Sequence, residues 1–331
     1  SRRSHWRGTN VSDIVYIGAP EASWADFGRR ARADFPKADL GGCDDRIAAP
    51  ALLADARGII AHHFQFDEAL LAAAPRLQWI QSLTTGTDAI VRLPNLGTRV
   101  RITSTRGMHG PQMSELVFLQ MLALLRDYPR MLRNQAAGRW ERWPQPLLWR
   151  KTAVIVGVGA ISEALAPRCK AFGMSVYGVS HSPRVPDGFD GVLPRGELVK
   201  AAALADFLIL VVPFSPETDN LIDARVIGAM RPHSFLINVA RGGVLDEQAL
   251  VRALREKRIA GAALDVFREQ PLPSGHPLWS EERVLISPLL GGMSDVYLEQ
   301  AYPIVRENLG HFLAGHPEQM INQVARGTPT P

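Results

Sequence analysis

Short apolar runs alternate with longer amphipathic segments over most of the chain. In the first hundred residues, four apolar runs predict buried strands, at Asp13–Gly18, Arg57–Ala61, Gln78–Ser82 and Arg99–Thr103. Helical periodicity between them predicts helices from Trp24 to Phe35 and from an Asp67 cap to Ala73. Strands that alternate with helices form parallel sheets covered on both faces, so the pattern predicts an α/β domain.

The alternation is repeated, with stronger apolar runs, in the second half of the chain. We expect six strands there, at 152–156, 175–179, 206–212, 234–239, 260–265 and 284–287. Pro111 opens a long apolar helix of about Met113–Leu125, and a final helix covers about Val296–Leu313. By its length and position, the final helix can return to the first domain. We therefore expect two doubly wound parallel-sheet domains, one inserted into the other.

The segment Thr152–Ser162 combines a strand and a glycine-rich turn, and the pattern predicts a helix over Glu163–Phe172 directly after it. Gly157 permits a tight turn after the apolar run, and Gly159 lets the backbone approach a pyrophosphate. The helix that follows offers free N–H groups and its positive dipole end to phosphates. Two glycines alone are weak evidence, since many turns contain them. The strand–turn–helix context favours dinucleotide binding over a purely structural turn.

The end of the next strand bears on the choice of cofactor. In NAD-binding folds of this type, an acidic residue about 20 residues after the glycines holds the ribose 2′-hydroxyl. Here the strand 175–179 leads into Ser180, His181, Ser182, Pro183 and Arg184, with no acid among them. Hydroxyl, imidazole and guanidinium groups suit a 2′-phosphate. The segment predicts NADP(H) in preference to NAD(H); the alternative is a solvated polar loop.

Composition and charge narrow the class of protein. The 331 residues allow two domains, and the net charge of +4 comes from scattered basic residues, which favours solubility over nucleic-acid binding. We find no apolar run of membrane-spanning length and no signal-peptide pattern. Cys43 and Cys169 predict free thiols in a cytoplasmic protein, and we expect no metal site. The polar first residues, with Arg2, Arg3 and Arg7, predict a disordered tail.

The segment 126–150 differs from its surroundings. It contains Trp140, Trp143 and Trp149 together with prolines and several arginines. Aromatic side chains at this density are typical of protein interfaces. We expect an arm that pairs two copies of the chain in a homodimer, and the alternative is an arm that packs on its own domain.

Polar residues that follow predicted strands are the candidates for chemistry. Arg241 follows the strand 234–239, and its guanidinium can hold a carboxylate and polarise an adjacent carbonyl. A surface ion pair is the alternative, and the buried strand and the two glycines that follow argue against it. Ligands of parallel sheets bind beyond the carboxyl ends of the strands. The loops 62–65, with His63, and 84–87 are therefore candidate substrate contacts.

Several further motifs occur in a fixed order along the chain. They are Gly157–Ile161, Val212–Pro213 with Pro216–Thr218, Asn238–Gly243, Ala263–Phe267, Pro271–Pro273, Ser287–Pro288 and Gly291–Gly292. With these motifs the chain resembles the D-isomer-specific 2-hydroxyacid dehydrogenases, including the glyoxylate/hydroxypyruvate reductases and phosphoglycerate dehydrogenases, over nearly its whole length.

The resemblance implies a dimeric NAD(P)-dependent oxidoreductase of small 2-oxo and 2-hydroxy acids. It implies a Rossmann nucleotide-binding domain at 110–296, inserted into a flavodoxin-like substrate domain at 1–109 and 297–331. The amides that bind the substrate carboxylate would be those of Thr85 and Gly86. Together with Ser180, His181 and Arg184 of the loop after residue 179, the following residues would contact the cofactor: Gly157, Gly159, Ala160, Ile161, Val212, Pro213, Thr218, Val239, Ala240, Asp265, Leu289 and Gly291.

The chain departs from the family at two of its three catalytic positions. In the family, an arginine accompanies a histidine that gives its proton to the substrate oxygen and a glutamate that keeps the imidazole charged and oriented. Arg241 matches the arginine. The glutamate position is Gln270, and the histidine position is Leu289, which cannot transfer a proton. Glu269 is one residue out of register.

Reduction of a 2-oxo acid then needs another proton source. We take His109, at the start of the long apolar helix, as the first candidate. His62, His63, Tyr297 and a water molecule beside Leu289 are the alternatives. Loss of the acid need not abolish turnover, since general acid catalysis contributes typically about 10²–10⁴-fold.

Two functions fit these residues. The first is an oxidoreductase, NADPH-linked, that transfers a hydride between the cofactor and a 2-oxo or 2-hydroxy acid. The second is an NAD(P)-binding protein without turnover that acts as a sensor or interaction module. Arg241 favours the enzyme, because a pure binder has little need of an arginine beside the nicotinamide. A third function, formate-type hydride abstraction, fits Gln270 but lacks the histidine.

Overall fold

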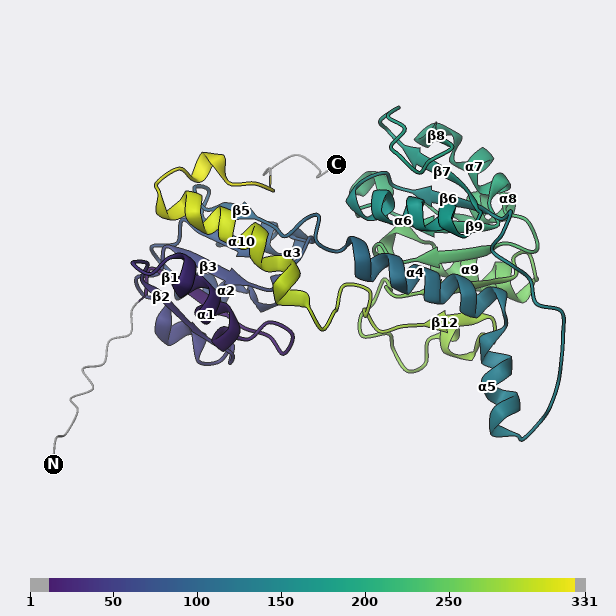
Figure 1. Ribbon diagram of the computed structural model, residues 1–331, viewed down its shortest axis with the longest axis horizontal. Coiled ribbons are helices and arrows are strands. Elements are labelled where there is room, and N and C mark those ends of the chain that lie inside the picture. The colour runs from purple at the N-terminus through teal and green to yellow at the C-terminus, as the bar shows by residue number, and fades with distance from the viewer. Residues whose placement is uncertain (1–11, 325–331) are drawn as a thin grey trace. The chain divides into compact units, whose positions relative to one another are not determined.

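The computed structural model describes residues 12–324, and the chain in it forms two compact units (Figure 1). The first unit extends to Met108 and resumes at Met293, and the second comprises His109–Gly292. The predicted tail with Arg2, Arg3 and Arg7 lies outside the described residues.

The first unit is built on a parallel sheet of five strands in the order β2-β1-β3-β4-β5, the order of flavodoxin-like folds. The strands are β1 (Ile14–Ile17), β2 (Leu40–Cys43), β3 (Gly58–Ala61), β4 (Trp79–Ser82) and β5 (Arg101–Thr103). The helices are α1 (Trp24–Asp34), α2 (Glu68–Ala72), α3 (Asp88–Val91) and α10 (Tyr297–Leu313). The predicted α/β class is confirmed for this unit.

Alternate residues of the strands point into two hydrophobic cores, one on each face of the sheet. Ile14 and Tyr16 pack with α1 and α10 on one face, whereas Val15 and Ile17 pack with α2 and α3 on the other. A buried polar network fixes α10 to the sheet. In it, the Asn308 side chain donates to Gln81 Oε1 at 2.8 Å and accepts from the Ile321 N–H at 2.7 Å.

The second unit contains a parallel sheet of seven strands in the order β12-β11-β10-β9-β6-β7-β8, an extended Rossmann order. The strands are β6 (Thr152–Val156), β7 (Ser175–Ser180), β8 (Gly191–Pro194), β9 (Phe207–Leu210), β10 (Phe235–Asn238), β11 (Gly261–Leu264) and β12 (Val284–Ile286). The helices are α4 (Gly110–Leu125), α5 (Tyr128–Ala136), α6 (Ala160–Ala171), α7 (Leu198–Leu204), α8 (Ala224–Ala229) and α9 (Glu247–Arg255).

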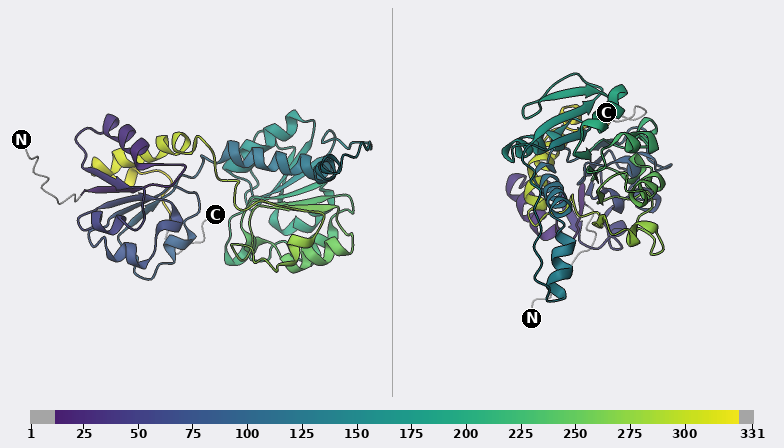
Figure 2. Two further views of the ribbon diagram at one scale, coloured as in Figure 1. Left: turned by 90° about the horizontal axis from the view of Figure 1, so that it is seen from below. Right: turned by 90° about the vertical axis from the view of Figure 1, so that its right-hand side faces the viewer.

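Both faces of the second sheet are covered by helices (Figure 2, left). The α4 and α6 side packs on residues such as Ala153 and Ile155, and the α7, α8 and α9 side packs on Val154 and Val156. Among the described residues, no helix has the length and apolar character needed to cross a membrane, and no group of three potential metal ligands occurs.

The sequence pattern missed one strand in each unit. β2 reads Leu-Gly-Gly-Cys, and glycine weakens a strand signal. The structure explains the glycine, because a Cβ at Gly42 would lie 2.6 Å from the Trp24 ring of α1. β8 contains Gly191 and Pro194 and is the edge strand of its sheet, where proline is tolerated.

The predicted helix starts were also late. α6 begins at Ala160, directly after the glycine turn, where the pattern indicated Glu163. α4 begins at Gly110, where the pattern indicated about Met113. In both cases most residues of the first turn are small or polar, and they carry little apolar periodicity.

Candidate cofactor and substrate sites

The glycine turn between β6 and α6 has the geometry of a phosphate cradle. Gly157 has a φ of +104°, and a Cβ there would lie 2.9 Å from the backbone of Val212, so only glycine fits. A Cβ at Gly159 would meet no atom within 4 Å, which leaves the backbone open to a ligand. Ala160 and Ile161 form the first turn of α6, whose N–H groups lack partners within the helix. These residues fit a dinucleotide pyrophosphate.

Ser162 supports this turn, at a position where dinucleotide-binding turns usually have Gly or Ala. Its hydroxyl accepts from the Gly159 N–H at 2.8 Å and donates to the Gly159 carbonyl at 2.9 Å. The side chain is fully buried, so the serine closes the turn on itself without facing a ligand.

The contact of Gly157 with Val212 lies at the point where the strand order reverses. β9 and β7 flank β6 on opposite sides, and ligands of doubly wound sheets bind at such a switch point. Val212 is buried and Pro213 is exposed after β9. The Thr218 hydroxyl donates to the Pro213 carbonyl at 2.9 Å, which holds this loop in place.

The polar loop after β7 is folded by its own serines. Ser180 Oγ accepts from the Ser182 N–H at 3.1 Å, and Ser182 Oγ accepts from the Arg184 N–H at 3.3 Å. His181 is exposed. The Arg184 guanidinium donates to the carboxylate of Glu163, in the first turn of α6.

Arg241 lies exposed after β10, on a loop that several contacts hold. Asn238 caps the strand end, since its side chain accepts from the Ala240 N–H at 3.0 Å and donates to the Arg241 carbonyl at 3.1 Å. Arg241 Nη1 donates to the Ala240 carbonyl at 2.8 Å. A Cβ at Gly242 would lie 1.9 Å from the Phe267 carbonyl carbon, so this position requires glycine. Val239 and Ala240 are buried.

Arg268 is a supporting residue that the sequence reasoning missed. Its guanidinium donates to the Gly243 carbonyl at 2.9 Å and to Asp219 and Asn220 at 2.8 Å each. It therefore ties the loop of Arg241 to a neighbouring loop. The sequence shows only that Arg268 follows the end of a predicted strand. Its hydrogen-bond partners Asp219 and Gly243 are distant in the sequence, so the contacts could not be predicted.

Asp265 organises the loop that carries Leu289. This buried carboxylate accepts from the Ser287 hydroxyl at 2.6 Å and from the N–H groups of Leu290 and Gly291 at 2.9 Å each. Leu289 has a φ of +58°, unusual for a branched side chain, and is 51% exposed. Both carboxylate oxygens of Asp265 therefore accept from this loop.

The other catalytic candidates of the second unit lie in different environments. Gln270 is exposed. His109 is 8% exposed at the N-cap of α4, and a Cβ at Gly292 would lie 3.6 Å from its Cδ2. The structure therefore brings His109 next to the end of the loop that contains Leu289.

In the first unit, the predicted substrate residues lie at the carboxyl ends of β3 and β4. His63 Nδ1 is 2.9 Å from Thr84 Oγ1, which is 2.9 Å from Ser82 Oγ and donates to the Gly86 carbonyl at 3.0 Å. Thr85 is exposed within this loop. The network links the loop to His63 and to the end of β4.

His62 differs from His63 in that it is buried. It is 2% exposed, between the rings of Phe64 and Tyr297, with centroids 5.2 Å away in each case. Its Nε2 has no hydrogen-bond partner among the described residues and is 3.4 Å from Glu21 Oε1. Burial, with a smaller contribution from His63, lowers the pKa of His62 to about 4. The Tyr297 hydroxyl donates to the Leu83 carbonyl. His62 is thus neutral at pH 7.

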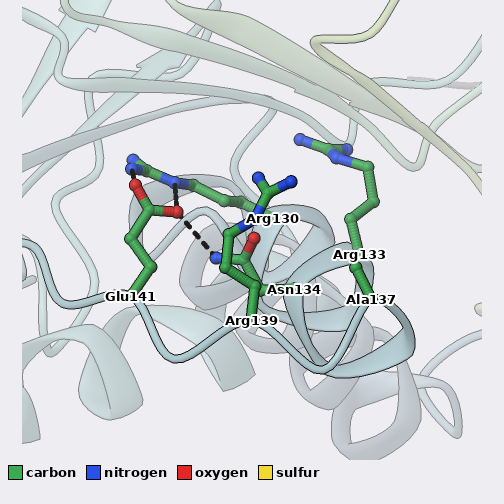
Figure 3. A pocket seen from close by; sticks show the side chains of 6 residues that line it. All are labelled: Arg130, Arg133, Asn134, Ala137, Arg139 and Glu141. Carbon is green, nitrogen blue, oxygen red and sulfur yellow. Dashed lines mark hydrogen bonds and ion pairs between the residues drawn. The ribbon is translucent and has the colours of Figure 1, made fainter.

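The arm at 126–150 presents aromatic and cationic groups. α5 extends away from the rest of the second unit (Figures 1 and 2). Trp140 is 93% exposed, and the Arg130 guanidinium lies 4.2 Å from the ring centroid of Trp143. A shallow hollow of about 490 Å³ on α5 is lined by Arg130, Arg133, Asn134, Ala137, Arg139 and Glu141 (Figure 3).

Comparison with known proteins places the chain in a family. Residues 118–291 match the family model for the D-isomer specific 2-hydroxyacid dehydrogenase NAD-binding domain. A glyoxylate reductase of Thermococcus litoralis is 32% identical over 78% of this chain and 80% of its own length. An (S)-sulfolactate dehydrogenase of Chromohalobacter salexigens is 33% identical over 87% of this chain and 94% of its own.

Two solved structures extend the comparison to the whole fold. A D-isomer specific 2-hydroxyacid dehydrogenase family protein from Aeromonas salmonicida has a TM-score of 0.86 and 31% identity, over 95% of this chain and 99% of that one. A D-isomer specific 2-hydroxyacid dehydrogenase from Xanthobacter autotrophicus in complex with NADPH and MES has a TM-score of 0.80 and 28% identity, over 96% and 98%. The chain belongs to the D-isomer-specific 2-hydroxyacid dehydrogenase family.

Proposed function

We propose that the protein is an NADPH-linked oxidoreductase that interconverts a 2-oxo acid and a 2-hydroxy acid. The observation that carries the proposal is Arg241, an exposed guanidinium on a rigid loop at the carboxyl end of β10. When bound, the nicotinamide cofactor supplies or accepts the hydride at C2 of the substrate. Family membership supports NAD(P)-dependent chemistry on 2-hydroxy acids, and the glyoxylate reductase relative supports a small substrate.

The proposed role of Arg241 follows from its positive charge and from the loop that carries it. Its guanidinium can hold the substrate carboxylate and stabilise the alkoxide that forms at C2. Asp265 supports the same region by fixing the loop of Leu289 and Gly291. In the first unit, we assign the carboxylate-binding amides to Thr85 and Gly86, on the loop that His63 and Thr84 stabilise.

The preference for NADPH rests on the loop after β7. Ser180, His181 and Arg184 can surround a 2′-phosphate with hydroxyl and cationic groups, and the loop contains no acid before Asp187. A relative bound to NADPH supports this choice. NADH remains the alternative cofactor.

The proton donor must differ from that of the family, because Gln270 and Leu289 replace the glutamate and the histidine. We assign the role to His109, whose ring adjoins Gly292, at the end of the Leu289 loop. Replacing His109 by glutamine should lower the rate of 2-oxo acid reduction and change its pH profile, with cofactor affinity unchanged. An unchanged pH profile would exclude His109.

We also propose that the arm at 126–150 pairs two copies of the chain. The support is the exposure of Trp140 and Trp149, 93% and 60%, on a segment that stands out from its unit. Large exposed aromatic groups are typical of interfaces.

The first test is oxidation of NADPH and of NADH, followed by absorbance, with glyoxylate, hydroxypyruvate, pyruvate and several bulky 2-oxo acids. Turnover with a 2-oxo acid, faster with NADPH than with NADH, is the expected result. Cofactor binding without turnover across the panel would contradict the proposed enzyme.

A second test addresses the replaced pair directly. The double variant Gln270→Glu/Leu289→His restores the family's acid, so its rate on small 2-oxo acids should rise above that of the wild type. Since general acid catalysis contributes about 10²–10⁴-fold, a gain of at least about tenfold is expected. No gain would mean that the site has been rebuilt around another donor or another reaction.

A cofactor-binding protein without turnover is the second candidate function. The observation that favours it is the combination of an intact glycine turn with the absence of the family's proton-donating pair. This function predicts tight NADPH binding and no turnover with any of the 2-oxo acids. It also predicts that the double variant Gln270→Glu/Leu289→His turns over no faster than the wild type.

A further inference from the structure

Glu163 occupies a position that bears on which dinucleotide the protein prefers. It lies in the first turn of α6, and its own N–H donates to the Gly159 carbonyl at 2.8 Å. It is therefore directly joined to the glycine turn. Its carboxylate is 36% exposed and pairs with Arg184, the cation of the loop after β7.

Arg184 is held from two sides. Its backbone N–H is fixed by Ser182 Oγ at 3.3 Å, which shapes the loop independently of the ion pair. Its guanidinium, 61% exposed, donates to Glu163. The loop backbone thus has a contact of its own, and the contact of the Arg184 guanidinium with Glu163 is separate from it. Among the described residues, no other acidic group pairs with Arg184.

The charges of this pair have opposite effects on the two cofactors. The adenine ribose of a dinucleotide lies at the end of the second strand of a Rossmann sheet, which here is β7. A 2′-phosphate carries up to two negative charges and favours Arg184, but the Glu163 carboxylate repels it and competes for the same guanidinium. A ribose hydroxyl is uncharged and meets no such repulsion.

We propose that Glu163 is a specificity-determining residue that limits the preference for NADPH by competing with the 2′-phosphate for Arg184. The proposal rests on the proposed function in that it takes NADPH as the cofactor. The loop after β7 has no acid before Asp187, and the acid that pairs with its arginine comes from α6.

The test is isothermal titration of the cofactor-free protein with NADPH and with NADH, at low salt. Glu163→Gln keeps the length of the side chain and its capacity to accept from Arg184, and removes the charge. Glu256→Gln is the matched control, because Glu256 is an exposed acid of the same unit. It lies at the C-terminal end of α9, whereas Glu163 lies at the N-terminal end of α6. Arg184→Gln reports whether the guanidinium binds the phosphate at all.

We expect Glu163→Gln to tighten NADPH binding about threefold to fivefold, the scale of an exposed ion pair, with no tightening of NADH. The gain should shrink in 0.5 M salt, because exposed charges are then screened. Arg184→Gln should weaken NADPH binding at least tenfold and NADH binding much less. Glu256→Gln should change neither affinity.

The affinities distinguish a failure of the proposed role of Glu163 from a failure of the NADPH assignment. If the wild type prefers NADPH and Glu163→Gln leaves NADPH affinity unchanged or weaker, the role of Glu163 is overturned and the cofactor assignment stands. Equal tightening of both cofactors would also overturn it, as a general charge effect. If the wild type prefers NADH and Arg184→Gln changes nothing, the NADPH assignment itself fails.

Discussion

The buried His62 should make the first unit sensitive to acid, and replacing it by glutamine should remove that sensitivity. The imidazole is 2% exposed, and its Nε2 has no hydrogen-bond partner within residues 12–324. Burial lowers its pKa from the ordinary 6.5 to about 4. The folded protein therefore resists a proton that the unfolded chain accepts.

The sign and size of the effect follow from linkage. Between pH 6.5 and 4 the unfolded state binds more protons at His62, so stability is present above pH 6.5 and is lost as the pH falls toward 4. At about 1.4 kcal/mol per pKa unit, the full loss is about 3 kcal/mol. About 2 kcal/mol of it is lost by pH 5.

The assay is amide hydrogen exchange measured by mass spectrometry at pH 7 and pH 5, corrected for intrinsic rates. Peptides from β1, β3 and β4 report the first unit, and peptides from the second unit serve as an internal reference. His233→Gln is the control, because that side chain is 56% exposed. His62→Gln should reduce the loss between pH 7 and pH 5 by about 2 kcal/mol. Equal losses in the wild type and in His62→Gln would refute the reasoning.

Three further predictions concern stability and assembly. Asp265→Asn should destabilise the second unit by about 3 kcal/mol and raise hydrogen exchange at 287–291, because the carboxylate binds two loop N–H groups and a hydroxyl; an unaltered loop would count against its anchoring role. Asn308→Ala should cost about 2–4 kcal/mol in urea unfolding, since it leaves buried groups of Gln81 and Ile321 unpaired. A loss below about 1 kcal/mol would show that water replaces them. Trp140→Ser should lower the molar mass measured by light scattering from that of a dimer to that of a monomer. A wild-type protein that is already monomeric would contradict the proposed arm interface.

The fold was largely predictable from the sequence, because its dominant signals are local. Short apolar runs predicted ten of the twelve strands found in the described residues, and the parallel α/β class is confirmed. β2 and β8 were missed because Gly41, Gly42 and Pro194 suppress a strand pattern. The need for Gly42 becomes visible only when Trp24 packs on it.

The candidate site was predictable only in part. The strand–turn–helix of Gly157 and Gly159 is a local pattern, and the structure gives it an open cradle. The pairing of Glu163 with Arg184 joins residues separated by 21 positions, and the pairing of Arg268 with Asp219 joins residues separated by 49. Neither spacing has a periodic signal. The roles of Arg241, Gln270 and His109 remain predictions.

We propose that Arg241 stabilises the charge that develops during hydride transfer to a 2-oxo acid, with Gln270 and Leu289 at the positions where the resemblance implies a glutamate and a histidine. The most direct measurement compares NADPH oxidation with glyoxylate, at pH 7, in Arg241→Ala and in the exposed control Arg252→Ala, together with the NADPH affinity of each. We predict that Arg241→Ala loses at least about 10²-fold in turnover, the scale of a lost transition-state donor, at unchanged affinity. The control should match the wild type. Equal turnover in Arg241→Ala and the wild type would contradict the account.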